Sequence, residues 1–179
     1  MSKRNIVLGV AGSIAAYKSA EIISQLIKQG FDVSVVMTKE AEAFITPLTL
    51  SVLSGNKVYR GMFEEPRDWD VEHVSLADAA SLVLIAPATA HLIAKLAAGF
   101  CDDLLTCIVA ATKAPVVLAP AMNDNMYNHK VTQGNIERLE KVGYKFIGPK
   151  EGRLACGRQA LGCLADVEDI VKAVKRHAA

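Results

Sequence analysis

Short apolar runs alternate with amphipathic segments along almost the whole of this 179-residue chain. Residues 6–10 are the first apolar run, and the residues after it repeat Ile and Leu at the spacing of one helix face. Alternation of this kind predicts an α/β fold, a doubly wound parallel sheet with right-handed crossovers. The expected strands are residues 6–10, 33–37, 57–59, 82–86, 114–119 and 144–147, and the expected helices are residues 13–29, 39–54 (broken or bent at Pro47), 75–80, 89–98, 103–112, 132–142 and 166–174.

Length and composition fit a single domain over residues 1–179. A chain of this length can bury about 70% of its unfolded surface. Hydrophobic residues make up 51% and aromatic residues only 6%, which predicts a core of small aliphatic side chains between helices and a parallel sheet. Residues 60–71, with the only tryptophan, Trp69, are the longest polar stretch, and residues 148–164 are rich in glycine without clear periodicity. We call residues 148–164 the flap.

Charge and hydropathy exclude several classes of partner. The formal net charge of +1 with no basic stripe argues against nucleic acid, and no run approaches the roughly 20 apolar residues of a membrane span. Lys3-Arg4 before an apolar run resembles a signal peptide, but Gly9 and Gly12 interrupt that run where a strand-to-helix turn needs them. The four cysteines form no CxxC pair or zinc pattern, so we expect no metal site and a reduced, cytoplasmic setting.

The first strand-to-helix turn, residues 9–14, is a candidate anion site. The amides at a helix N-terminus and the Ser13 hydroxyl would face a bound anion, and Thr38 after the second strand would add a hydroxyl. GxGxxG is absent, which disfavours a dinucleotide. Tyr17 occupies the second glycine position of a Walker A loop, which disfavours a nucleoside triphosphate. A mononucleotide phosphate fits better.

Three segments at strand ends have both a structural and a functional interpretation. In residues 120–123, the Asn123 amide could grip a small polar group beside an apolar cofactor or simply cap a helix. The small residues of 86–89 leave room for a planar ring, and equally permit tight helix–sheet packing. The acids and the hydroxyl of residues 102–107 could contact a ligand, cap the following helix, or do both.

His73 and Cys156 are the candidates for proton transfer. His73 follows the long polar stretch at an expected helix start, where a structural role is the alternative. Cys156 lies in the flap, where a partly exposed thiol near a cofactor could act as an acid or a nucleophile.

Taken together, these motifs resemble the homo-oligomeric flavin-containing cysteine decarboxylases, and within them the phosphopantothenoylcysteine decarboxylases in their free-standing form. The resemblance covers essentially the whole chain in order. Residues 120–126 and the Cys156 segment are specific within that superfamily, whereas the first turn is shared more broadly. The departures are His91, where many relatives have Asn, and Ala160-Leu161-Gly162-Cys163-Leu164, where a GxGRM-like ending is common; they concern the substrate contacts of the flap. The motifs that carry the resemblance are residues 12–18, His73, and residues 86–89, 120–126 and 155–157.

The resemblance implies a Rossmann-like flavoprotein fold, FMN as cofactor, and assembly as a trimer or a tetramer of trimers with FMN and substrate at subunit boundaries. It implies His73 as the active-site histidine, Asn123 as the ligand of the substrate carboxylate and Cys156 as the proton donor. Substrate contacts fall on Asn123, Met122, Met126 and Ala155. The residues implied for FMN are Gly12, Ser13, Thr38, Ala86, Pro87, Ala88, Thr89, Thr106, Cys107, Ile108, Val109 and Ala121.

The implied reaction is the decarboxylation of 4'-phosphopantothenoylcysteine to 4'-phosphopantetheine in coenzyme A biosynthesis. The flavin would oxidise the substrate thiol, CO2 would leave, and the resulting enethiolate would be re-reduced. Two alternatives stay open within the resemblance. One is a peptidyl-cysteine decarboxylase of lantibiotic maturation, which would differ in the flap, and the other is a non-catalytic regulatory flavoprotein.

Overall fold

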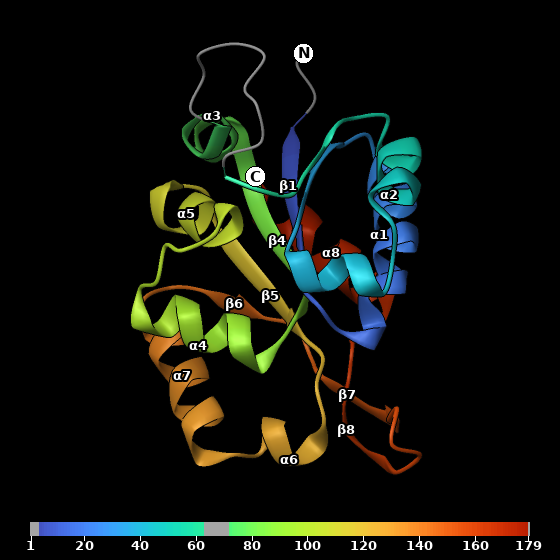
Figure 1. The fold of residues 1–179 in the computed structure, drawn as a ribbon, viewed down its shortest axis with the longest axis vertical. Coiled ribbons are helices and arrows are strands. Elements are labelled where there is room, and N and C mark those ends of the chain that lie inside the picture. The colour runs from blue at the N-terminus through green and yellow to red at the C-terminus, as the bar shows by residue number, and fades with distance from the viewer. Residues whose placement is uncertain (1–3, 63–71, 179) are drawn as a thin grey trace.

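A six-stranded parallel sheet with helices on both faces forms the centre of the molecule (Figure 1). The computed structural model describes residues 4–62 and 72–178, so most of the polar stretch around Trp69 lies outside the described residues. The strand order β3-β2-β1-β4-β5-β6 confirms the predicted doubly wound α/β sheet. The strands are β1 Asn5–Val10, β2 Asp32–Met37, β3 Val58–Tyr59, β4 Ala80–Ala88, β5 Val116–Pro120 and β6 Lys145–Phe146.

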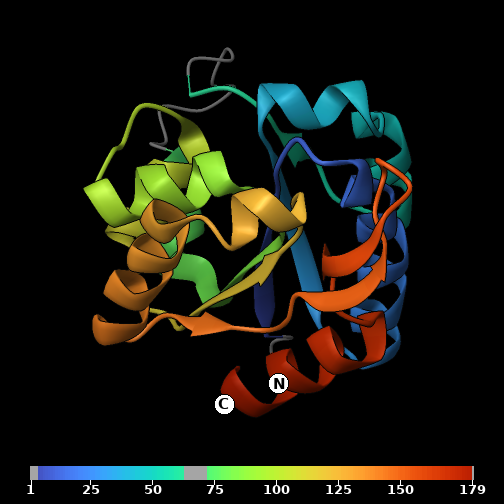
Figure 2. The same cartoon turned by 90° about the horizontal axis from the view of Figure 1, so that it is seen from below.

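The helices divide between the two faces of the sheet, as Figures 1 and 2 show. α1 (Ser19–Lys28), α2 (Pro47–Ser54) and α8 (Val167–His177) cover one face, while α3 (Glu72–Ala79), α4 (Ala90–Ala98), α5 (Leu104–Ala111) and α7 (Lys130–Lys141) cover the other. Successive strand residues point to opposite faces and feed two separate cores. Leu8 belongs to the core under α1 and α8, and its neighbour Val7 to the core under α4 and α5.

Two of the expected helices are each divided into a 3-10 helix and an α-helix. The helix expected over residues 13–29 opens with a 3-10 turn, η1 (Ile14–Lys18), before α1. The helix expected over residues 39–54 is broken before Pro47, as predicted, into the 3-10 helix η2 (Lys39–Ala43) and α2. Proline sits at the first position of α2, where its missing N–H has no partner to lose.

The flap folds into a two-stranded antiparallel hairpin, which the sequence pattern had not indicated. Strand β7 (Lys150–Arg153) pairs with β8 (Gln159–Cys163), and the hairpin projects below the main sheet in Figure 1. A short helix beside it, α6 (Asp124–Tyr127), was also not expected.

The last helix begins after Asp166, as expected, and differs from expectation at its C-terminal end. It extends to His177 rather than ending at Val174, and Asp166 occupies the N-cap position without a side-chain capping bond. The Asp166 carboxylate instead pairs with Lys150 of the hairpin. None of the helices within residues 4–62 and 72–178 is long and apolar enough to cross a bilayer.

Candidate cofactor and active site

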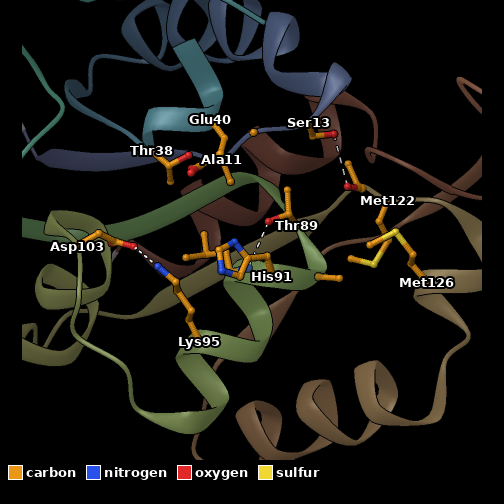
Figure 3. A pocket seen from close by; sticks show the side chains of 14 residues that line it. Ala11, Ser13, Thr38, Glu40, Thr89, His91, Lys95, Asp103, Met122 and Met126 are labelled. Carbon is orange, nitrogen blue, oxygen red and sulfur yellow. Dashed lines mark hydrogen bonds and ion pairs between the residues drawn. The ribbon is translucent and has the colours of Figure 1, made fainter. Parts of the chain in front are cut away.

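A cavity of about 300 Å³ opens at the carboxyl ends of β1, β2, β4 and β5 (Figure 3). The strand order reverses between β1 and β4, and a doubly wound sheet leaves its ligand crevice at that point. Seven residues predicted for cofactor or substrate line this cavity: Gly12, Ser13, Thr38, Thr89, Ala121, Met122 and Met126. The remaining lining residues are Ala11, Glu40, Ala90, His91, Leu92, Lys95 and Asp103.

The first turn is held tightly against its neighbours. The Ala11 amide donates to the Pro87 carbonyl at 3.3 Å, which joins the ends of β1 and β4. The Ser13 hydroxyl caps η1 by accepting from the Ala15 amide at 3.3 Å. A Cβ added at Gly12 would lie 2.4 Å from the Cβ of Glu40, so the close approach of the turn to η2 requires glycine.

Thr38 carries the clearest sign that the cavity takes a polar ligand. Its hydroxyl is buried, and it is the one buried side-chain N or O atom without a hydrogen-bond partner among residues 4–62 and 72–178. A buried hydroxyl left unpaired costs about 1–3 kcal/mol. An acceptor entering the cavity beside Ser13 and the start of η1 would remove that cost, and a phosphate oxygen has this chemistry. The residues present therefore fit the phosphate end of a mononucleotide.

On the opposite wall, Lys95 of α4 bridges two carboxylates. Its amino group lies 2.9 Å from Asp102 and 2.9 Å from Asp103. The hydrogen bond to Asp103 raises the pKa of Lys95, although burial acts against it. Burial alone would raise the pKa of the Asp103 carboxyl, but hydrogen bonds from Lys95 and Thr106 hold that pKa below its ordinary value. Both groups are thus charged near neutral pH.

Asp103 also begins α5, as the capping interpretation of residues 102–107 predicted. Its carboxylate accepts from the Thr106 amide at 2.8 Å, and the Asp103 amide donates to the Thr106 hydroxyl at 3.2 Å. This reciprocal capping box fixes the loop that faces the cavity. No motif pointed to Lys95; its place in the last turn of α4, a few residues before two acids, was the available signal.

His91, which departs from the Asn of many relatives, is also a lining residue. Thr89 caps α4, accepting from the Leu92 amide at 3.2 Å, and this confirms the predicted helix start. Figure 3 shows the His91 imidazole projecting into the cavity between Thr89 and Lys95.

Several residues implied for FMN do not line the cavity. All of them except Cys107 are buried, and the Thr106 hydroxyl is engaged in the capping box. Cys107 is partly exposed, and its thiol donates to the Cys101 carbonyl at 3.3 Å. Flavin contacts by these residues remain a prediction. The residues in this group are Ala86, Pro87, Ala88, Thr106, Cys107, Ile108 and Val109.

Asn123 and Cys156 lie together. Asn123 caps α6, its side-chain oxygen accepting from the Asn125 amide at 2.9 Å, while its side-chain nitrogen lies 3.9 Å from the Cys156 sulfur. The capping interpretation of Asn123 is confirmed, and its functional interpretation stays a prediction. Cys156 is exposed in the turn between β7 and β8, next to the exposed Ala155.

His73 lies elsewhere. It is half-buried in α3, which stands at the opposite end of the molecule from α6 and the hairpin in Figure 1. One chain thus brings Asn123 and Cys156 together and leaves His73 apart from them.

Comparisons with known proteins agree with this architecture. A family model described as Flavoprotein matches residues 1–179. The chain is 46% identical over 176 residues to a Streptococcus mutans protein named "Probable phosphopantothenoylcysteine decarboxylase", covering 97% of this chain and 98% of that protein. The solved structure of SpaF, described as an FMN-dependent cysteine decarboxylase, matches with a TM-score of 0.86 at 32% identity over 98% of both chains.

A longer relative matches over part of its length. The coenzyme A biosynthesis bifunctional protein CoaBC of Bacillus subtilis is 45% identical over 177 residues, which are 99% of this chain and 44% of that protein. The chain therefore spans less than half the length of this bifunctional relative.

The Lys95–Asp103 pair predicts a pH dependence of stability. The lowered pKa of Asp103 stabilises the fold above the ordinary carboxyl range, and this contribution is lost as pH falls through the folded-state pKa. We expect Asp103→Asn, which keeps a capping side chain, to lower the free energy of unfolding by about 1 kcal/mol between about pH 5 and pH 9. The difference from wild type should shrink as pH falls through the lowered folded-state pKa of Asp103.

Chemical denaturation across this pH range measures the difference. Asp102→Asn is the matched control, because the Asp102 side chain is 53% exposed against 33% for Asp103 and caps no helix. A wild-type advantage over Asp103→Asn that persists unchanged at pH 2.5 would contradict the electrostatic account.

Proposed function

This chain belongs to the Flavoprotein family, and on that premise we propose that it is an FMN-dependent phosphopantothenoylcysteine decarboxylase. It would act as a carboxy-lyase in cytoplasmic coenzyme A biosynthesis, converting 4'-phosphopantothenoylcysteine to 4'-phosphopantetheine. The observation that carries the proposal is the pairing of Asn123 with Cys156 beside Met122 and Met126, which line the cavity. The names of the Streptococcus mutans relative and of SpaF support the reaction and the cofactor.

The cofactor is FMN. Gly12, Ser13 and Thr38 are suited to hold its phosphate, because the Thr38 hydroxyl is buried without a partner and the turn leaves no room for a side chain at Gly12. Thr89 and Ala121 line the same cavity. When bound, FMN supplies a reversible two-electron oxidation of the substrate thiol, which gives the carboxylate a neighbouring electron sink.

Asn123 and Cys156 have different roles toward the substrate: one binds its carboxylate and the other donates a proton. The Asn123 amide can donate a hydrogen bond to the substrate carboxylate and so fix the bond that breaks when CO2 leaves. Cys156, 3.9 Å away, is exposed to a substrate held there and can donate its proton to the product carbon. Hydrogen bonds from the backbone and side chain of Arg158 lower the pKa of Cys156, which favours release of that proton.

His73 would reach this site from a second subunit. The distance of α3 from α6 within one chain supports an active site shared between chains, and thus a homo-oligomer. A trimer, alone or as a tetramer of trimers, would satisfy this requirement. At the shared site His73 would act as a base or orient the substrate.

The reaction itself can be tested on the purified protein. We expect CO2 and 4'-phosphopantetheine to appear on incubation with 4'-phosphopantothenoylcysteine, and no CO2 from a cysteine-terminated peptide at the same concentration. Mass spectrometry of the products distinguishes the two. Turnover of the peptide alone would reassign the chain to a peptidyl-cysteine decarboxylase.

Thr38→Val tests the cofactor site, because it should affect the stability of the apoprotein and the affinity for FMN in opposite directions. Removing an unpaired buried hydroxyl should leave the apoprotein at least as stable as wild type, and should weaken FMN binding roughly ten- to a hundredfold. Fluorescence titration with FMN and denaturation of the apoprotein measure both. Thr112→Val is the matched control, because its hydroxyl donates to the Ala77 carbonyl at 3.0 Å; it should lose stability and keep FMN affinity. Unchanged FMN affinity in Thr38→Val would rule out the phosphate site.

Mixing two inactive variants tests the shared site. His73→Ala and Asn123→Ala should each bind FMN and release no CO2. Each site in a mixed oligomer needs an intact residue from each of two chains, so random co-assembly should restore roughly a quarter of wild-type activity. Co-expressed variants with separate affinity tags allow the measurement. No recovery in verified mixed oligomers would place His73 outside the shared site.

A further inference from the structure

An ion pair fastens the turn that carries Cys156 to helix α6. The Arg158 guanidinium lies 2.5 Å from the Asp124 carboxylate. The Asp124 side chain is only 18% exposed, whereas that of Arg158 is 51% exposed. Asp124 directly follows Asn123, and Arg158 is two residues after Cys156, so the pair runs parallel to the Asn123–Cys156 contact.

The same arginine also contacts the thiol. Arg158 lies two residues after Cys156 on a turn closed by bonds from the Leu154 amide to the Arg158 carbonyl and from the Gly157 amide to the Leu154 carbonyl, each 2.8 Å. Hydrogen bonding from the backbone and the side chain of Arg158 lowers the pKa of Cys156. A guanidinium is planar, always charged and rich in donors, so it can serve a carboxylate and a sulfur at once. Arg158 therefore links the anchor on α6 to the reactive sulfur.

The base of the hairpin is fixed independently of this ion pair. The Met122 amide donates to the Gly162 carbonyl at 3.0 Å, and a Cβ added at Gly162 would lie 2.2 Å from the Met122 carbonyl oxygen. Gly162 also has a φ of +155°, which favours glycine. The hairpin is thus docked on the strand end at its base, and the Arg158–Asp124 pair acts at its tip.

We propose that Arg158, anchored by Asp124, is a positioning residue for the proposed reaction: it holds the Cys156 thiol beside Asn123 and keeps a positive charge against the sulfur. The inference rests on the proposed function for its catalytic meaning. When the S–H bond of Cys156 breaks and the proton passes to the product carbon, the sulfur is left as a thiolate. Arg158 offsets that charge, and the sulfur regains a proton from solvent before the next turnover.

The charged groups that face Cys156 act in opposite directions. Arg158 favours the thiolate and the Asp124 carboxylate opposes it, while Asn123 is neutral. If Asp124 were only a nearby charge, its removal would favour the thiolate. If it anchors Arg158, its removal frees the guanidinium and disfavours the thiolate. The two roles therefore predict opposite responses to one substitution.

Alkylation of Cys156 by iodoacetamide measures the thiolate without requiring turnover. The rate is followed on the FMN-bound protein from pH 6 to pH 9 by peptide mass spectrometry, which separates Cys156 from the other three cysteines. The variants are Arg158→Met, Arg158→Lys and Asp124→Asn, with Arg153→Met as the control because Arg153 is an exposed arginine on the same hairpin.

We expect Arg158→Met to slow alkylation at pH 7 roughly three- to tenfold, because the thiolate fraction falls. Arg158→Lys should recover part of the rate, Asp124→Asn should also be slower than wild type, and Arg153→Met should be unchanged. A wild-type rate in Arg158→Met, or an equal or faster rate in Asp124→Asn, would overturn the proposal. If Arg158→Met does not fold, the Asp124→Asn rate alone decides.

Steady-state kinetics with 4'-phosphopantothenoylcysteine add a second readout. A positioning role predicts that Arg158→Met lowers kcat and leaves KM within about twofold. A raised KM with wild-type kcat would overturn it in favour of direct substrate binding by Arg158. If the wild-type protein turned over no substrate, the alkylation pattern would still decide whether Arg158 and Asp124 control the thiol, so the two proposals can fail separately.

Discussion

The reversal of strand order between β1 and β4 is the constraint on which the rest of the site depends. The two strands are paired in the middle of the sheet, but the chain leaves them toward opposite flanks. Their carboxyl ends therefore bound a crevice that no crossover helix fills. Thr38, Thr89 and Ala121 reach the same crevice because β2, β4 and β5 are parallel and end at the same edge. The positions of the polar groups follow from the topology.

Sequence patterns predicted the centre of the sheet well because β1, β4 and β5 are buried on both faces and read as continuous apolar runs. The hairpin escaped prediction because β7 and β8 are short and interrupted by glycine, and neither buries a large apolar side chain. Helix α6 has only four residues, too few for any helical period to appear. Motif resemblance singled out Cys156, but its 3.9 Å approach to Asn123 depends on how the hairpin docks.

What the sequence left open was which of these residues share the cavity. His91 and Lys95 lie four apart on α4, and only the packing of that helix shows that their shared face is turned to the cavity. The ion pair between Asp103 and Lys95 joins a loop to a helix, and the spacing of residues in the sequence does not predict such a contact. The separation of His73 from Asn123 and Cys156 also follows from the fold, because α3 and α6 lie at opposite ends of the molecule. This separation is the reason to propose that two chains form one active site.

The most direct test of the account is an anaerobic single-turnover experiment on the purified protein. Addition of 4'-phosphopantothenoylcysteine should bleach the absorbance of bound flavin, and the absorbance should return as CO2 and 4'-phosphopantetheine appear in equal amounts. Release of CO2 by protein that carries no flavin and takes up none would contradict the account, as would stoichiometric turnover with a flavin spectrum that never changes.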